Sequence, residues 1–233
     1  MGQLIAIAFP RWIPNVGARI SASCPQLAPQ IKADLFWGYY ERAEIRFVRK
    51  YLKADLDAVE LGSSIGVTAS HMARRLSPGR RLVCVEPNES YLKSIEKNVR
   101  RNAPNVSLLI MHGAISYEEP FSDTVWFEPA ERNVEGRLSN KEDNSARGVE
   151  GPRLDLKGVL SAGSVDEFTL VCDIEGAETQ LLGRGLDDLD RCKQLIIELH
   201  PDSGEDIDGM LQRLVTRDFE IKDRRGDVFV LER

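Results

Sequence analysis

Short apolar runs alternate along the chain with longer segments in which apolar residues recur every three or four positions. The runs have the length of strands and lack regular alternation with polar residues, which is typical of strands buried on both faces of a sheet. They occupy Leu56 to Leu61, Arg81 to Glu86, Val106 to Met111, Val165 to Asp173 and Gln194 to Leu199. This pattern predicts the strands of a mostly parallel sheet.

The segments between these runs have the spacing of amphipathic helices, as Leu92, Ile95 and Val99 illustrate for one of them. Helices are predicted over Glu41 to Lys53, Val67 to Leu76, Asn88 or Ser90 to about Asn102, Leu154 to Leu160, Gly176 to Leu182 and Ile207 to Arg217. Alternating strands and helices indicate an α/β fold that is doubly wound, with helices on both faces of the sheet.

The end of the chain departs from this alternation. Phe219 to Ile221 and Val228 to Leu231 lie on either side of Arg224-Arg225-Gly226-Asp227, which predicts a C-terminal antiparallel hairpin. In sheets of this kind ligands bind at the carboxyl ends of the strands. Five polar residues fall at or just after predicted strand ends, namely Glu60, Glu86, His112, Asp173 and His200.

Two regions show little periodicity. Residues Met1 to Gln30 contain four prolines, so residues 1–40 are expected to form an irregular N-terminal arm that lies over the domain or contacts another subunit of a homo-oligomer. Residues 41–233 are expected to form one domain. Its apolar density falls at about 118–151, apart from Thr124 to Phe127, which could be an edge strand. We expect this stretch to be a lid-like insertion that covers a substrate.

Composition narrows the class of protein. A chain of 233 residues with 42% hydrophobic and 29% charged residues is typical of a single soluble α/β domain. A net charge of −6 argues against a nucleic-acid partner. The four cysteines form no C-x-x-C pair, which suggests reduced thiols in the cytoplasm. The apolar run from Leu4 to Phe9 is too short to span a membrane.

A candidate binding site follows the first predicted strand, in the sequence D-A-V-E-L-G-S-S-I-G from Asp57 to Gly66. Gly62 and Gly66 would let the backbone turn tightly and approach a ligand, because a Cβ atom at either position would obstruct it. Glu86 ends the second strand about twenty residues later, where an acidic residue meets the two ribose hydroxyls in nucleotide-binding βαβ units. An ordinary β-to-α turn is the simpler interpretation of the glycines.

Glu60 distinguishes between cofactors. An acid just before the glycine turn would lie badly beside a pyrophosphate, whereas it suits a ligand with a cationic amino group. The pattern therefore favours S-adenosylmethionine over NAD. A nicotinamide-dependent oxidoreductase would be expected to have G-x-G-x-x-G, and the middle glycine is missing. A binding or scaffolding protein that keeps the cofactor fold without turnover is the third alternative.

Three residues are candidates for catalysis. Asp173 could be a general base beside the cofactor, or it could cap the following helix. His200 could also act as a base, or it could be a histidine hydrogen-bonded in a loop. Glu175 and Glu178 could complete a divalent-metal site with Asp173. Acids at a helix start are also stabilised by the helix dipole, however, and on that interpretation no metal site is expected.

The other histidines and the aromatic residues have less defined roles. His112 is expected near the adenine of the cofactor, and His71 in a surface helix with no role in the site. Four aromatic residues could line an acceptor pocket or belong to the core, namely Trp37, Tyr39, Tyr40 and Trp126.

Several motifs together resemble one known family. They are V-E-L-G-S-S-I-G, C-V-E-P-N, H-G-A-I-S from His112 to Ser116, D-I-E-G-A-E from Asp173 to Glu178, and I-I-E-L-H from Ile196 to His200. With the pair Tyr40-Glu41, these segments resemble the FkbM-type family of S-adenosylmethionine-dependent methyltransferases over roughly residues 39–200.

This resemblance implies a Rossmann-like sheet of seven strands, S-adenosylmethionine as cofactor, and methylation of a hydroxyl oxygen on a sugar, glycan or natural product. It implies that the cofactor is contacted by Glu60, Gly62, Gly66, Glu86, Asn88, Gly113, Ala114 and Asp173. We add their chain neighbours Ser63 and Pro87 to this set. Ser63-Ser64 departs from the family, in which Ala-Asn is more frequent at these positions. Methyltransferases of amides and nucleobases commonly have N/D-P-P-Y/F after the fourth strand, and D-I-E-G stands there instead.

Overall fold

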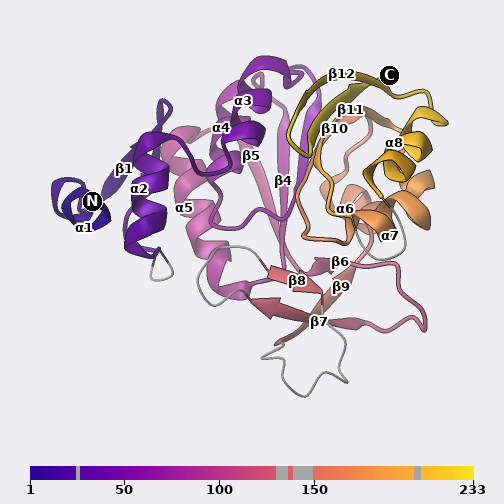
Figure 1. Cartoon of the computed structure of the whole chain (residues 1–233), viewed down its shortest axis with the longest axis horizontal. Helices are drawn as coiled ribbons and strands as arrows, with labels where there is room; N and C mark the ends of the chain where they lie inside the picture. The colour runs from indigo at the N-terminus through magenta and orange to yellow at the C-terminus, as the bar shows by residue number, and fades with distance from the viewer. Residues whose placement is uncertain (25–26, 130–135, 139–148, 202–205) are drawn as a thin grey trace.

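The main sheet of the protein has seven strands. The computed structural model describes residues 1–24, 27–129, 136–138, 149–201 and 206–233. In it, the order of the seven strands is β12-β13-β11-β10-β3-β4-β5 (Figure 1). The strands are β3 (Asp57–Leu61), β4 (Arg81–Glu86), β5 (Ser107–His112), β10 (Phe168–Cys172), β11 (Cys192–Glu198), β12 (Glu220–Arg225) and β13 (Val228–Glu232). Neighbouring strands in this sheet are parallel except where β13 pairs with β11 and with β12. The predicted parallel sheet and its C-terminal hairpin are confirmed.

Helices cover both faces of the sheet. One face carries α3 (Arg42–Tyr51), α4 (Val67–Arg75) and α5 (Leu92–Asn102), which follows the 3₁₀ turn η1 (Glu89–Tyr91). The other carries α6 (Leu156–Gly163), α7 (Glu178–Gly183) and α8 (Ile207–Val215), with η2 (Leu186–Leu189) after α7. Successive strand residues point to opposite faces. Val59 therefore packs with the second group of helices, and Ala58 with the first.

The N-terminal arm is regular, so the prediction of an irregular segment is wrong. It folds into α1 (Gly2–Ala8), a hairpin of β1 (Trp12–Asn15) and β2 (Ala18–Ser21), and α2 (Pro29–Trp37). The prolines are compatible with these elements. Pro29 is the first residue of α2, where its missing N–H would have no helical partner, and Pro14 lies in a two-stranded ribbon.

The arm is attached to the domain by its own apolar cluster and by buried polar contacts. Its residues pack with Ile45 and Tyr91 of the domain. His71 is buried rather than on the surface, and its Nε2 lies 2.8 Å from Oδ1 of Asn15 in β1. Burial lowers the pKa of His71 to about 4, so the ring is neutral near pH 7. The expected surface position was wrong because the hairpin of the arm covers α4.

The insertion and the residues that flank it form a second sheet. Its strands are β6 (Ala114–Ile115), β7 (Thr124–Pro129), β8 (Gly136–Leu138) and β9 (Val149–Leu154), in the order β6-β9-β7-β8. The predicted strand at Thr124 to Phe127 is present, but it lies between two partners and is not an edge. Residues 130–135 and 139–148 of the insertion lie outside the described residues. In Figure 1 this small sheet lies below the carboxyl ends of the parallel strands.

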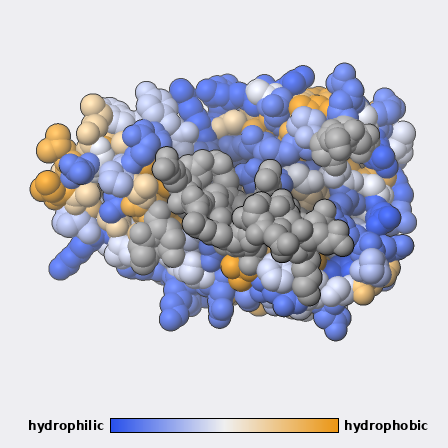
Figure 2. Space-filling view, turned by 60° about the horizontal axis from the view of Figure 1, so that its bottom comes forward, coloured by the Kyte–Doolittle hydropathy of each residue, from blue (hydrophilic) through white to orange (hydrophobic). Residues whose placement is uncertain are grey.

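The face turned forward in Figure 2 is largely hydrophilic. Hydrophobic residues gather at its left edge, at the end of the molecule that holds α1, where Met1, Leu4 and Ile7 are exposed. Among the helices of the described ranges, none has both the length and the apolar character needed to cross a membrane.

Candidate active site

A cavity of about 850 Å³ opens at the carboxyl ends of the parallel strands. Its walls come from the segment that leads into α3, the turn after β3, the ends of β4 and β10, β6 and β7 of the small sheet, and the turn of the β12–β13 hairpin. The volume is that of a typical small-molecule site. The position agrees with the expectation that ligands bind at this edge of the sheet.

Strand alternation explains why carboxyl groups gather at this cavity. Glu60 follows Ala58 by two positions, and Glu198 follows Ile196 by two, so both acids project to the face covered by α3. Glu41 and Glu44 approach the same region from the start of α3. Burial raises the pKa of Glu41 to about 7 and that of Glu44 to about 8, and the charge of Glu198 adds to both shifts.

The glycines of the turn are required, although for a reason that differs from the prediction. Gly62 has φ +84°, and a Cβ atom there would lie 1.8 Å from the carbonyl oxygen of Asp173. Gly66 has φ +81°, and its Cβ would lie 2.8 Å from Cα of Ile95. The glycines thus allow the protein backbone to pack against itself behind the cavity, whereas the prediction placed the ligand there. Of the two, only Gly62 lines the cavity.

Glu86 lies at the cavity, and its role as the ribose ligand stays a prediction. It is buried at the end of β4 and lines the cavity. Its Oε2 accepts a hydrogen bond from the backbone N–H of Ser64 at 2.7 Å, and its Oε1 accepts one from the N–H of Asn88 at 2.8 Å. Ser64 has φ +48°, a left-handed conformation that asparagine tolerates better than serine.

Glu60 and Ser63 lie beneath the turn and are not part of the cavity wall. Both side chains are buried, and within the described residues neither Oε2 of Glu60 nor Oγ of Ser63 has a hydrogen-bond partner. Burial raises the pKa of Glu60 to about 8, and the nearby charges of Glu41 and Glu86 add to the shift. The proposed contact between Glu60 and the amino group of a cofactor therefore stays a prediction.

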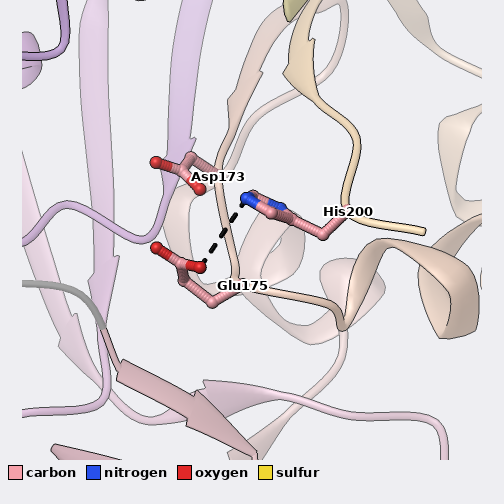
Figure 3. Close-up of side chains that lie close together, drawn as sticks. All are labelled: Asp173, Glu175 and His200. Atoms are coloured by element: carbon pink, nitrogen blue, oxygen red, sulfur yellow. Dashed lines mark ion pairs between the residues drawn. The ribbon is translucent and has the colours of Figure 1, made fainter. Parts of the chain in front are cut away.

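The three catalytic candidates come together after β10 and β11. Asp173 and Glu175 lie on the turn after β10, and His200 lies just past the end of β11. One ligand atom from each lies within 4.8 Å of the other two. Figure 3 shows the two carboxyl groups and the imidazole pointing toward one another, with Oε2 of Glu175 at 3.6 Å from Nε2 of His200.

The capping role considered for Asp173 is wrong, because Ala177 is the N-cap of α7 and no side chain caps this helix; Glu178, its first residue, fixes the preceding turn. Oε1 of Glu178 accepts from the N–H of Ile174 and Oε2 from the N–H of Gly176, both at 2.8 Å. Asp173 instead has a buried Oδ1 without a partner among the described residues. Burial raises the pKa of the Asp173 carboxyl well above its usual range, and the charge of Glu198 adds to the shift.

His200 is held from its other side by Glu178. Its Nδ1 lies 3.3 Å from Oε1 of Glu178, which is fully buried. This hydrogen bond is the largest of the effects that raise the pKa of His200 to about 9. The same contact orients the ring, so that its Nε2 faces Oε2 of Glu175. The geometry agrees with a loop histidine held by a hydrogen bond, and the role of His200 as general base stays a prediction.

The remaining predicted residues are partly at the cavity. Pro87, Gly113 and Ala114 line it, whereas Asn88 contributes its backbone N–H to Glu86 from outside the wall. His112 lies 3.0 Å from the carbonyl oxygen of Pro87 and supports that loop. Of the aromatic candidates, only Tyr39 and Tyr40 line the cavity.

Sequence reasoning missed three contributors. Glu198 and Glu44 line the cavity without having been assigned a role, as does the hairpin turn at residues 225–228. The signal for Glu198 was available, because it lies two positions before His200 and thus points to the same side of the strand end. The hairpin turn could not have been found from its sequence, since its position depends on the antiparallel pairing of β13 with β11.

The strand order, with one antiparallel strand inserted beside β11, and the carboxylate at the end of β4 together define a Rossmann-like methyltransferase fold. The family model of the methyltransferase FkbM domain matches residues 60–223. The chain belongs to the FkbM methyltransferase family, and the resemblance found in the sequence is confirmed. Among curated proteins there is no match.

Several solved structures match this chain at low identity and with TM-scores below 0.5. A methyltransferase from Pyrococcus furiosus is 13% identical over 99% of this chain and 91% of its own, with a TM-score of 0.46. One from Geobacter sulfurreducens is 17% identical over 89% of each chain, with a TM-score of 0.46. Aeropyrum pernix fibrillarin in complex with S-adenosylmethionine is 14% identical over 82% of this chain and 73% of its own, with a TM-score of 0.45.

The cavity fits an adenosyl ligand on its own geometry. Both oxygens of Glu86 are oriented by backbone N–H groups, so the carboxylate is held in one orientation and keeps lone pairs for further donors such as two vicinal hydroxyls. On the opposite side of β3, Oδ1 of Asp173 is buried and has no hydrogen-bond partner among the residues that the structure describes. Both oxygens of Glu86 thus have hydrogen-bond donors from the backbone, whereas Oδ1 of Asp173 still needs a donor. A ligand held between the two carboxyl groups would provide one.

Proposed function

We propose that the protein is an S-adenosylmethionine-dependent methyltransferase that methylates a hydroxyl oxygen of a sugar, a glycan or a natural-product small molecule. The fixed carboxylate of Glu86, beside a glycine turn in a chain of the FkbM family, is the observation that supports this proposal most directly. Glu86 would hold the ribose hydroxyls, and the turn from Gly62 to Ser64 would lie along the rest of the cofactor.

The cofactor supplies the methyl group: the acceptor oxygen forms the new C–O bond as the bond from sulfur to methyl breaks, and sulfur keeps that electron pair to give S-adenosylhomocysteine. Asp173 would take the hydroxyl proton, because its Oδ1 is buried and has no partner among the described residues. A positioned base of this kind contributes typically about a hundredfold to ten-thousandfold. Holding the acceptor in line can contribute roughly 7–11 kcal/mol.

The charge of the cavity supports a neutral acceptor rich in hydroxyls. Its wall contains more acidic than basic side chains, with eight carboxyl groups against Arg42, Arg225 and His200; the acids are Asp34, Glu41, Glu44, Glu86, Asp173, Glu175, Glu198 and Asp227. Such a wall repels phosphates, which disfavours nucleic acid, whereas carboxylates accept hydrogen bonds from sugar hydroxyls. The segment D-I-E-G after β10 also lacks the N/D-P-P-Y/F pattern expected for amide and nucleobase acceptors.

Two further expectations stay predictions. The cytoplasmic location rests on the cysteine pattern, and a homo-oligomer rests on the arm. The exposed side chains of Met1, Leu4 and Ile7 on α1 are compatible with a subunit contact.

Isothermal titration of the purified protein with S-adenosylhomocysteine, run beside NAD, tests the proposal. Saturable micromolar binding of S-adenosylhomocysteine and no binding of NAD is the expected result. Acceptors would then be screened with S-adenosylmethionine labelled in its methyl group, starting with sugars and polyhydroxylated compounds. Binding of NAD instead would favour an oxidoreductase, and binding of neither ligand would contradict the proposed activity.

A further inference from the structure

We propose that Asp173, Glu175 and His200 form a binding site for one divalent cation at the acceptor side of the cavity. From the sequence, the acids after β10 are interpreted as residues stabilised by a helix dipole, so no metal is expected. The arrangement of the three side chains in the folded protein favours a bound metal ion. The three side chains offer two carboxylate oxygens and one imidazole nitrogen within 4.8 Å of one another. Ligand atoms that surround one ion are separated by distances of this order, since each lies about 2.0–2.6 Å from it.

The first supporting observation is the unsatisfied carboxyl of Asp173. Its Oδ1 is buried, and the described residues provide no hydrogen-bond donor for it. An orphaned buried carboxylate oxygen costs several kcal/mol in general, so it normally has a partner or holds a proton. In Figure 3 the Asp173 carboxyl faces the space that it shares with Glu175 and His200. A cation in that space would supply the missing partner.

The second observation is the orientation of His200. Its Nδ1 faces the buried Oε1 of Glu178 at 3.3 Å, while its Nε2 faces Oε2 of Glu175 at 3.6 Å. Metal-binding histidines usually donate one ring N–H to a carboxylate, which leaves the other nitrogen free for the ion. Glu178 is itself fixed by the N–H groups of Ile174 and Gly176. The imidazole is thus held in the orientation that a metal ligand requires.

The third observation is the density of negative charge. Oε1 of Glu198 lies 4.0 Å from Nε2 of His200, so three carboxyl groups other than Glu178 surround this nitrogen. Carboxylates crowded in this way repel one another, and a bound cation would reduce that repulsion. Glu178 would then act as a positioning residue, because it contacts the ligand His200 and not the ion.

The ligand set indicates the kind of cation. Two carboxylates with one imidazole suit ions that accept both oxygen and nitrogen, such as Mn²⁺, better than Mg²⁺, which prefers oxygen ligands alone. The use of the ion rests on the proposed function. With three protein ligands, coordination positions remain open, and an acceptor hydroxyl bound there would be held beside the cofactor and would lose its proton more readily.

Electron paramagnetic resonance with MnCl₂ as the probe tests the site without any acceptor. Free Mn²⁺ gives a strong six-line signal that decreases on binding, so titration gives stoichiometry and affinity. We expect one saturable site per chain. We expect His200→Ala and Glu175→Gln each to weaken binding at least tenfold, and Glu178→Gln to weaken it by roughly tenfold to a hundredfold through the loss of the histidine orientation. Circular dichroism would show that each variant is folded.

Asp227→Asn is the matched control. Asp227 lines the same cavity but is exposed and pairs with Arg224 at 3.6 Å, outside the cluster. Its substitution should leave Mn²⁺ affinity unchanged. The absence of saturable binding to the wild-type protein at millimolar MnCl₂ would overturn the proposal. So would equal weakening by Asp227→Asn and His200→Ala, since this would indicate general attraction of cations by an acidic cavity.

Titration with S-adenosylhomocysteine separates this inference from the proposed function. Binding of S-adenosylhomocysteine without Mn²⁺ binding would overturn the metal site and leave the methyltransferase proposal standing. Binding of Mn²⁺ without S-adenosylhomocysteine would support the site and contradict the proposed activity.

Discussion

Glu86 and Asp173 occupy equivalent places on either side of β3, yet their surroundings differ. Glu86 ends β4, Asp173 follows β10, and both strands pair with β3. Each oxygen of Glu86 accepts a backbone N–H, whereas Oδ1 of Asp173 is buried with no partner in the described chain. A carboxylate already satisfied by the backbone is positioned to bind hydroxyls without rearrangement. A buried carboxylate oxygen without a hydrogen-bond donor, such as Oδ1 of Asp173, requires a proton, a cation or a substrate. We therefore expect Glu86 to bind the cofactor and Asp173 to act in the reaction.

Asp173→Asn is the strongest test of this division. The substitution keeps the shape of the side chain and removes the charge that would take a proton or hold a cation. We expect methyl transfer to an identified acceptor to fall by about a hundredfold to ten-thousandfold, with S-adenosylhomocysteine affinity changed only a few-fold. Transfer would be measured with methyl-labelled cofactor. Near-normal turnover would remove Asp173 from the mechanism, and Asp166→Asn, at an exposed ion pair, is the control.

Glu86→Ala tests the other side. It removes the acceptor of both ribose hydroxyls, and hydrogen bonds to a charged group contribute about 1.5–3 kcal/mol each. We expect the affinity for S-adenosylhomocysteine to fall by about a hundredfold or more in isothermal titration, with the circular dichroism spectrum unchanged. Glu89→Ala, at an exposed acid three positions further on, should bind normally. Unchanged affinity in Glu86→Ala would refute the ribose assignment.

Gly62→Ala tests whether the turn that joins the two sides is fixed by packing. The added Cβ would overlap the carbonyl oxygen of Asp173 at a positive φ. We expect the free energy of unfolding to fall by about 3 kcal/mol, as measured by denaturant titration. Gly79→Ala is a matched control. Gly79 also has a positive φ, but a Cβ atom added there would have no atom within 4 Å apart from those of its own residue and its two chain neighbours. A loss of about 1 kcal/mol is expected there, and equal losses in the two variants would contradict the packing argument.

Glu60→Gln should have the smallest effect of these substitutions, and it should change how the free energy of unfolding depends on pH. The pKa of Glu60 is raised to about 8 in the folded protein, mainly by burial, with Glu41 and Glu86 nearby. The folded state therefore keeps a proton that the unfolded chain loses at an ordinary carboxyl pKa, and stability falls as pH rises from about 5 to about 8. Between pH 6 and pH 8 the free energy of unfolding should decrease in both proteins. We expect the decrease to be about 1–2 kcal/mol smaller in Glu60→Gln than in the wild type.

Thermal or urea unfolding at several pH values would measure this difference. Glu96→Gln, at an exposed acid of α5, should show the same pH dependence as the wild type. A Glu60→Gln protein that follows the wild-type curve would show that this carboxyl is ionised within the fold.

The order of strands and helices was determined by the sequence itself, because apolar runs and helical spacing reflect local burial. Glu86 could also be found this way, since a strand end and a glycine turn lie close together in a βαβ unit. The arm was not predictable in the same way. Its short elements are stabilised by contacts with Ile45 and Tyr91 and by the pair of Asn15 with His71, which are distant in the chain.

Only the tertiary structure decided how the carboxyl groups are used. The motif D-I-E-G-A-E suggested that Asp173 could cap a helix, but the turn places Glu178 on the N–H groups and on His200. It also places Glu175 and His200, which follow different strands, against the unpaired oxygen of Asp173. Sequence patterns give the side of a strand on which each residue lies. The partner of each buried charge depends on three-dimensional packing, because charges interact through space over distances that local periodicity does not encode.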